Sequence, residues 1–417
     1  MRLKIKCNFK EYIEWCLTFL VIFFSGSAYA ASNNNFYIFL KYAVTLSIIL
    51  IWFIKCKGIL RYKTKDRELA IWIPIVWCCI LFFNCVFHSE PLINLIIRMM
   101  HVILAYAIVS IVSWEKFIEN YTRIIIIIAT ISLACYFVFA NMSIYDLIMP
   151  KLLGYTLEGE LYTKYQGFLL YFKTTDLRNF GAFWEPGIFA THILVALLLF
   201  PYAKVNKNKK LLYVILIITL ITTASGAGYV LSLMVVAFNI VSKLELGNTK
   251  DLAKGFVAIG IIGILIFVYM NLDSVISALP LEDNIIFNKI LNISDSERAQ
   301  SININWKAFQ EKPLLGYGYN GLIESDWYSY GSSKKIVIDT ATSFRLLAVH
   351  GISGAFFTVI LIRGILKNRK INFFGKMIAI VIALLIINKE AHDSFLLAWC
   401  LMMYLNGREG RTRERKK

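Results

Sequence analysis

Residues 91–113 read PLINLIIRMMHVILAYAIVSIVS, a run in which Arg98 is the one charged side chain. A bilayer core about 30 Å thick is crossed by about 20 apolar residues in a helix, so this stretch is predicted to span a membrane. Eleven further apolar stretches are predicted to span as well: 13–31, 36–54, 69–87, 124–142, 186–203, 211–223, 226–242, 255–272, 341–362, 371–388 and 390–406. The sequence therefore predicts an all-α polytopic protein with about 12 transmembrane helices, forming a single integral membrane domain over 1–417.

The composition excludes an ordinary soluble protein. Of 417 residues, 58% are hydrophobic and only 17% are charged, far from soluble usage. Twelve spans of roughly 20 residues leave little chain for a soluble domain. In a soluble chain the net charge of +17 would suggest nucleic acid. Here it is predicted to report membrane orientation, with membrane lipids and no nucleic acid as partners.

The positive charges predict the orientation. With the N-terminus inside, 30 of the 44 Lys and Arg fall in inner segments and 11 in outer connections. This bias places both termini in the cytoplasm. The basic segment 407–417 is then a cytoplasmic tail, predicted to be a disordered anchor on anionic lipid. Two long connections, 143–185 and 273–340, lie outside.

Two local alternatives bear on this map. The stretch 211–242 is either one long helix or two short ones turning at 222–226, and the charge map requires two. The first span also resembles a secretory signal, with Ala28-Tyr29-Ala30 as a cleavage site. Retention and cleavage both leave the remaining map intact.

Charged side chains inside predicted spans are the first functional candidates. Arg345 lies about one turn inside its span, and Arg98 lies roughly 10 Å from the outer end of another, with His101 one turn deeper. Such charges are costly in a bilayer unless they face a cavity or a partner. A structural ion pair is the alternative for each arginine.

Two outer segments add candidates. Glu185 precedes Pro186 and is predicted to be the N-cap of the sixth span, with Glu185 and His192 lining one wall. The turn 388–393 carries His392 and Asp393 between two spans that are short for a bilayer. It is expected either to line a wet cavity or to be an ordinary polar turn.

Four arginines are assigned to the outer half of the protein: Arg98, Arg178, Arg298 and Arg345. Guanidinium groups bind phosphate bidentately and keep their charge. They therefore indicate an anionic lipid pyrophosphate as substrate.

These motifs resemble the O-antigen polymerase and ligase superfamily of bacterial envelope enzymes. One match is Arg178-x-x-Gly181-x-Phe183-x-Glu185-Pro186, which opens a span after an outer loop. The other is Arg298, then Trp306, Phe309, Pro313 and Gly316-x-Gly318, followed by Gly351-x-x-Gly354. The likeness covers 170–360 in detail and the rest of the chain in outline.

The resemblance implies a GT-C-type glycosyltransferase of the inner membrane whose site faces the periplasm, which makes 143–185 and 273–340 periplasmic loops. Polymerases move a glycan from undecaprenyl pyrophosphate onto a lipid-linked repeat unit, and ligases move it onto lipid A core. Ligases of the family carry a His-Asn-type pair eleven residues before Gly-x-x-Gly, where this chain has Thr340-Ala341. A polymerase is therefore favoured, with a chain-length regulator and a flippase as expected partners.

The proposed chemistry assigns the four arginines to the pyrophosphate. Glu185 is the first candidate for the base that activates the acceptor hydroxyl, and His392 or Asp393 is the second. No Asp-x-Asp pair stands in the outer loops, so no metal or other cofactor is expected. A lipid-linked oligosaccharide flippase is the rival from another class, since it also has about twelve spans and buried cations.

Overall fold

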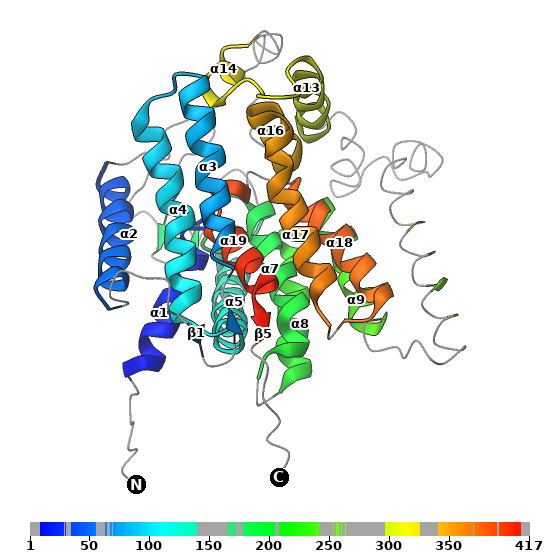
Figure 1. The fold of residues 1–417 in the computed structure, drawn as a ribbon. Coiled ribbons are helices and arrows are strands. Elements are labelled where there is room, and N and C mark those ends of the chain that lie inside the picture. Colours follow the sequence, from blue (N-terminus) through cyan, green and yellow to red (C-terminus); the bar gives the residue numbers. More distant parts are fainter. Residues whose placement is uncertain are drawn as a thin grey trace, which may run out of the picture. The chain divides into compact units, whose positions relative to one another are not determined.

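The chain was described from a computed structural model. The described residues are 9–28, 30, 35–55, 63–64, 67–68, 70–139, 166–167, 170–171, 178–204, 208–241, 253, 256–257, 260, 263, 297–325, 341–369, 371–389 and 392–409. Most of them are helical, as the all-α class predicts. Figure 1 shows the elements in chain order.

Most of the apolar helices coincide with predicted apolar stretches, whereas α13 (Glu297–Glu311) and α14 (Tyr319–Ile323) lie in a predicted loop. Their bounds are α1 (Phe9–Phe23), α2 (Asn35–Lys55), α3 (Trp72–Phe87), α4 (Leu92–Ile111), α5 (Trp114–Phe139), α7 (Pro186–Leu199), η2 (Phe200–Tyr202), α8 (Lys209–Thr222), α9 (Gly226–Val241), α13 (Glu297–Glu311), α14 (Tyr319–Ile323), α16 (Thr342–His350), η3 (Gly351–Gly354), α17 (Ala355–Lys367), α18 (Phe373–Ile387), η4 (His392–Ser394) and α19 (Leu396–Asn406).

Among the described residues, three helical segments are long and apolar enough to cross a membrane: Leu92–Ile111, Trp114–Phe137 and Thr342–Lys367. Six shorter apolar helices accompany them. These features are consistent with a membrane protein. The predicted span 255–272 lies largely outside the described residues, and the number of spans stays a prediction.

The chain divides into two compact units. Unit 1 comprises 1–69, 103–225 and 407–417, and unit 2 comprises 70–102 and 226–406. This division into units of contacts does not test the prediction of a single integral membrane domain over 1–417, which stays a prediction.

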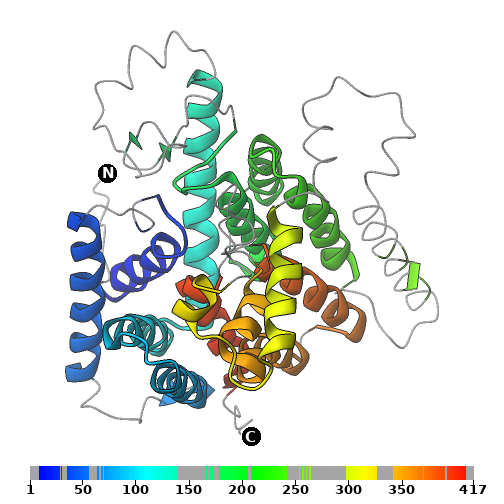
Figure 2. The same cartoon turned by 90° about the horizontal axis from the view of Figure 1, so that it is seen from above.

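Unit 1 is organised around α5. Helices α1, α7 and α8 all pack against it, as Figure 2 lets the reader follow. The helix starts ten residues before the predicted span, because its polar first turns form ion pairs of their own. Glu119 lies 3.4 Å from Lys116 and 2.7 Å from Arg123. Segment 114–123, expected to be an inner loop, is thus the first part of a long helix.

Unit 1 also holds short antiparallel strands. Strand β1 (Lys63–Thr64) pairs with β2 (Arg67–Glu68), which pairs in turn with β5 (Arg408–Glu409). A second pair joins β3 (Gln166–Gly167) and β4 (Leu170–Tyr171). The pairing of β2 with β5 corrects the expectation of a wholly disordered tail at its first residues, because backbone hydrogen bonds hold Arg408 and Glu409. The later tail residues lie outside the described part.

Unit 2 is built on a broken helix, α16–η3–α17. Helix α13 packs on α16, α17 packs on α18 and α19, and α18 packs on α9. Trp399 lies at the centre of an aromatic cluster, with its ring 5.0 Å from Phe357 and 5.1 Å from Trp77. Figure 1 shows α13 and α14 beside the start of α16. The predicted outer loop 273–340 therefore contains two helices at that end.

The stretch 211–242 is two helices, as the charge map requires. Helix α8 ends at Thr222 and α9 begins at Gly226. Between them Ala224 has a φ of 46°, a left-handed conformation that a continuous helix does not contain.

The first span is packed into unit 1. Side chains of α1 such as Val21 and Ile22 are buried, and the following residues pair with the segment before α7. Ala28 N donates to Ala182 O at 3.1 Å, and Trp184 N donates to Gly26 O at 3.3 Å. These bonds join the residues after α1 to the segment before α7, and they leave retention and cleavage of the first span as alternative predictions.

Candidate functional site

A cavity of about 200 Å³ lies within unit 2, at the end formed by α14 and the start of α16. Helices α3, α4, α14 and α16 and the turn η4 supply its walls. The side chains that carry chemistry there are Trp77, Arg98, His101, Tyr319, Arg345 and Asp393. Five of these six residues are titratable or cationic, and they come from α4, α14, α16 and η4, which are far apart in the chain, so folding has gathered them.

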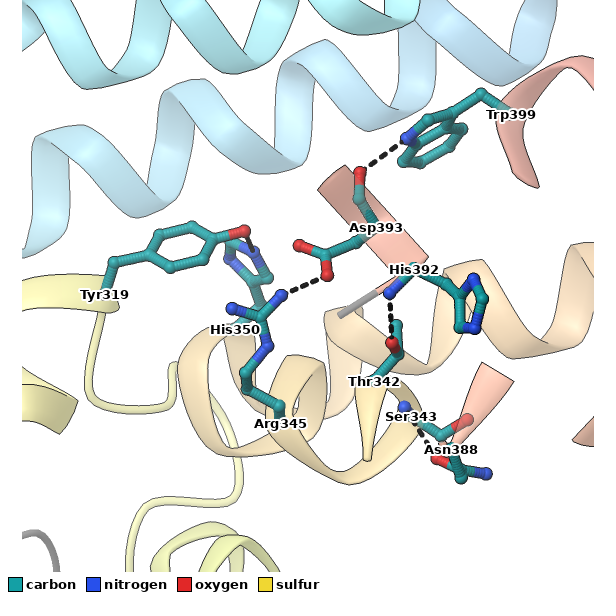
Figure 3. Close-up of polar contacts among 9 residues, drawn as sticks. All are labelled: Tyr319, Thr342, Ser343, Arg345, His350, Asn388, His392, Asp393 and Trp399. Carbon is teal, nitrogen blue, oxygen red and sulfur yellow. Dashed lines mark hydrogen bonds and ion pairs between the residues drawn. The ribbon is translucent and has the colours of Figure 1, made fainter. Parts of the chain in front are cut away.

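Arg345 and Asp393 form a buried ion pair on one side of the cavity. Arg345 Nη2 donates to Asp393 Oδ1, and each side chain is only 9% exposed. The turn that carries Asp393 is fastened to its neighbours: Trp399 Nε1 donates to Asp393 O at 2.8 Å, and His392 N donates to Thr342 Oγ1 at 2.7 Å. Figure 3 shows these contacts around the first turn of α16. The pair is thus held in a defined geometry.

This geometry bears on the two alternatives for the turn 388–393, a wall of a cavity or an ordinary polar turn. Asp393 lines the cavity, so the turn is more than a polar connection. Asn388 accepts from Ser343 N at 3.0 Å and ties the turn to α16 a second time. Desolvated ion pairs cost several kcal/mol per charge unless further hydrogen bonds compensate, which explains the density of backbone anchors.

Arg98 reaches the cavity from α4 and meets an aromatic ring. Its guanidinium carbon lies 2.9 Å from the centroid of the Tyr319 ring. The Tyr319 hydroxyl is 3.2 Å from His350 Nε2, and the two rings meet edge to face at 5.1 Å. His101, one turn deeper, has Nδ1 3.0 Å from Ile97 O of its own helix. Arg98 and Arg345 therefore share a cavity although different helices carry them.

Formal charges make this cavity cationic. Two guanidinium groups face one carboxylate, which leaves an excess of one positive charge among its described lining residues. A charge of this kind in a partly enclosed, largely apolar space attracts anions more strongly than it would in water. Guanidinium groups bind phosphate groups, like carboxylates, through two parallel hydrogen bonds.

Two glycine motifs explain how Tyr319 is placed. Gly316, Gly318 and Gly351 have φ values of 70°, 73° and 62°, in the region that favours glycine. A Cβ on Gly316 or Gly351 would overlap backbone of the opposite segment. The Gly316-x-Gly318 loop thus lies backbone on backbone against the break between α16 and α17.

Backbone hydrogen bonds hold the Gly316-x-Gly318 loop against the break between α16 and α17. Tyr317 N donates to Ala348 O and Gly318 N to Val349 O, both at 2.9 Å, while Ile352 N donates to Pro313 O at 2.8 Å. At the start of α14, Glu90 Oε1 accepts from Tyr319 N and, at 3.3 Å, from Asn320 N. The motif is therefore a rigid support for the residue that follows it.

The first motif is built into unit 1. Asn179 Oδ1 accepts from Gly181 N, and Asn179 Nδ2 donates to Ser132 Oγ at 3.2 Å and to Thr222 Oγ1 at 3.0 Å. A Cβ on Gly181 would come within 2.7 Å of the Phe189 ring. Much of this motif is therefore structural.

Arg178 and Glu185 lie at the two ends of that motif. Arg178 is half-buried, with its guanidinium carbon 5.8 Å from the centroid of the Phe180 ring. Glu185 is the N-cap of α7 with Pro186 in the first turn, as predicted, and its side chain makes no capping hydrogen bond. Both belong to unit 1, so their meeting with the unit 2 arginines remains a prediction.

His192 does not line an open wall, which corrects the expectation for α7. It is 1% exposed and fully engaged, with Nδ1 2.9 Å from the Tyr121 hydroxyl and Nε2 2.7 Å from Ser25 O. The Phe183 ring stacks on it at 4.4 Å. The shared helical face exists, but the neighbouring helices α1 and α5 cover its inner part.

The remaining candidates separate clearly. Arg298 lies in the first turn of α13, and its side chain is outside the described part of the structure. His392 is buried with its ring 4.8 Å from Phe395, and Figure 3 shows that ring turned away from the Asp393 carboxylate. Within the described residues, no group of three or more His, Cys, Asp or Glu is placed to hold a metal ion.

Sequence reasoning missed the importance of Tyr319, Trp77 and Glu90. The sequence did point to Tyr319, because it directly follows the Gly316-x-Gly318 motif, whose glycines permit a sharp turn. It did not point to Trp77 or Glu90, since an apolar span and a short connection contain such residues routinely. Comparison with known proteins adds no identification: no family model matches the chain, and no curated protein matches it.

Proposed function

We propose that this protein is a membrane glycosyltransferase, an O-antigen polymerase that lengthens a surface polysaccharide from undecaprenyl-pyrophosphate-linked units at the periplasmic face. The observation that carries the proposal is the joint placement of Arg98, Arg345 and Asp393 around one cavity. The resemblance of the sequence motifs supplies the substrate class.

In the proposed reaction, a hydroxyl of the acceptor sugar attacks the anomeric carbon that bears the pyrophosphate. The new C–O bond forms as the old one breaks, and its electron pair leaves with the pyrophosphate. Arg98 and Arg345 stabilise the departing negative charge, with Arg178 and Arg298 as further candidates. By analogy with arginines in phosphoryl transfer, one such group supplies about 10³ to 10⁵ in rate.

Asp393 is the preferred base in this proposal, because it lines the same cavity as the two arginines. It accepts the proton of the attacking hydroxyl. Glu185, the first candidate from the sequence, belongs to the other unit, and His392 faces a phenylalanine ring. A base contributes about 10² to 10⁴ in rate, less than the loss expected for an arginine.

The test is the surface glycan of cells that carry Arg345→Gln or Arg98→Gln. We expect the ladder of chain lengths to collapse to a single repeat unit on the core. Arg98→Gln should leave normal amounts of protein in the membrane. Arg345→Gln leaves the buried Asp393 carboxylate without its ion-pair partner, so its ladder is compared at an equal amount of membrane protein. Arg363→Gln is a matched control: this arginine also stacks on an aromatic ring, Trp72 at 4.8 Å, but lies outside the cavity.

Three other outcomes contradict the proposal. Loss of all repeat units from the surface would favour the flippase, because the unit would stay inside the cell. Polymer that accumulates on its lipid carrier without reaching the core would favour the ligase. A full ladder in both cavity variants would remove the site itself.

A further inference from the structure

We infer that Tyr319 is a positioning residue that orients Arg98 for the anion in the unit 2 cavity. The inference deepens the proposed function and rests on it for the nature of the anion. It names a residue that acts through Arg98 and not on the substrate directly.

The position of the Tyr319 ring is determined at three points. Its backbone N–H donates to Glu90, its hydroxyl lies 3.2 Å from His350 Nε2, and its ring packs edge to face on the His350 ring. His350 itself is 1% exposed and packs edge to face on Trp77 at 5.4 Å. A ring held in this way cannot rotate without breaking buried contacts.

The ring presents its face to the guanidinium of Arg98. The electron-rich face attracts the cation, and this attraction grows when water is excluded. Tyr319 is 8% exposed, so the contact is largely shielded from solvent. The contact therefore restrains the Arg98 side chain at the cavity wall.

Arg98 and Arg345 meet different kinds of partner at the cavity. Arg345 is oriented by the carboxylate of Asp393, whose turn is anchored to α16 and α19. The Arg98 guanidinium has the Tyr319 ring as one of its contacts. An arginine side chain carries about 2 kcal/mol of rotamer entropy, and fixing it beforehand reduces the loss on binding.

The loop that precedes Tyr319 has a tightly constrained backbone, and its docking explains how the Tyr319 ring is placed. The glycines at 316 and 318 allow the loop to dock on the α16–α17 break, and α14 begins with Tyr319 immediately afterwards. The motif would then serve to place a ring over an arginine.

The experiment is a double-mutant cycle on the full-length protein in lipid nanodiscs, with binding of inorganic pyrophosphate as the readout. Tyr319→Phe keeps the aromatic face, and Tyr319→Leu removes it at similar size. We expect Tyr319→Leu to weaken pyrophosphate binding about 3- to 10-fold and Tyr319→Phe to restore most of it. In an Arg98→Gln background, Tyr319→Leu should add no further loss, because its effect passes through Arg98.

Equal binding by the Phe and Leu variants would overturn the inference, since the aromatic face would then be irrelevant. An undiminished effect of Tyr319→Leu in the Arg98→Gln background would overturn it too. Wild-type pyrophosphate binding by both Arg98→Gln and Arg345→Gln would instead refute the anion site of the proposed function, and the inference with it. The first two results leave that site standing.

A second measurement covers the case in which Tyr319→Leu fails to fold. Phenylalanine and a trifluorinated phenylalanine at position 319 have nearly the same shape, but fluorine withdraws electrons from the ring face. Weaker binding of pyrophosphate by the fluorinated protein would support the inference. Equal binding by the two would contradict it.

Discussion

Single residues in unit 2 show how an intramembrane charge is accommodated. Arg345 was open to two interpretations, a structural ion pair or a substrate contact, and its geometry satisfies both. It pairs with Asp393 and also lines a cavity. A buried pair alone is weak support for stability, because a hydrophobic pair of similar volume often does as well. Its location beside a second arginine is what favours function.

The first prediction separates these two uses. Asp393→Ala leaves the Arg345 charge buried without its carboxylate, and we expect the free energy of unfolding to fall by about 3–5 kcal/mol. The double variant Arg345→Met with Asp393→Leu should recover most of that stability, yet produce no polymer. Denaturant unfolding in detergent and gels of the surface glycan measure the two effects. Restored polymer in the double variant would show that the pair is purely structural.

At the scale of elements, the two sequence motifs have different structural uses. The segment from Arg178 to Pro186 is fastened into unit 1 through Asn179 and the Gly181 turn. The glycines near 316 and 351 join a loop to a helix break in unit 2. In both cases glycine is required by backbone approach, and the residues with chemical potential stand at the ends of the rigid piece.

The second prediction concerns this helix break. Gly351→Ala and Gly316→Ala each place a Cβ against opposing backbone at a positive φ, and we expect each to destabilise the protein by at least about 2 kcal/mol. Gly321→Ala is the matched control, because no atom lies within 4 Å of its added Cβ. Thermal unfolding in detergent gives the comparison. Equal melting temperatures for all three variants would argue against the docked loop.

At the scale of the whole molecule, the contacts inside each unit agree with the charge-based map. In unit 1, β2 and β5 join two segments predicted to be inside, and Asn179 joins two predicted to be outside. In unit 2, Lys367 Nζ donates to Asn406 O at 2.7 Å, again between two inner segments. The hydrogen bonds within each unit therefore join helix ends that the charge-based map places on the same side of the membrane.

The third prediction tests which side is which. In a protein without its eight native cysteines, Glu324→Cys and Arg369→Cys replace exposed side chains in the predicted outer loop and inner loop of unit 2. A thiol reagent that does not cross the inner membrane should label Glu324→Cys in whole cells. Arg369→Cys should react only after the membrane is opened. The reverse pattern would invert the map and move the cavity to the cytoplasmic side.

Run length and charge in the sequence were sufficient to locate most of the apolar helices that the structure describes, because an apolar run of span length is visible in each segment independently. They did not locate α13, whose residues are largely polar, or the five-residue helix α14. They did identify Arg98 and Arg345, since a charge inside an apolar run is conspicuous in any sequence. The sequence did not predict which side chains these residues contact. The contacts join residues far apart in the chain: Arg345 with Asp393, Arg98 with Tyr319, and His192 with Ser25. Helical periodicity predicts the face of a helix on which a residue lies, but it does not predict which other helix covers that face. That choice is made by the packing of the helices against one another, so tertiary structure alone decided that His192 is buried and that the two arginines share a cavity.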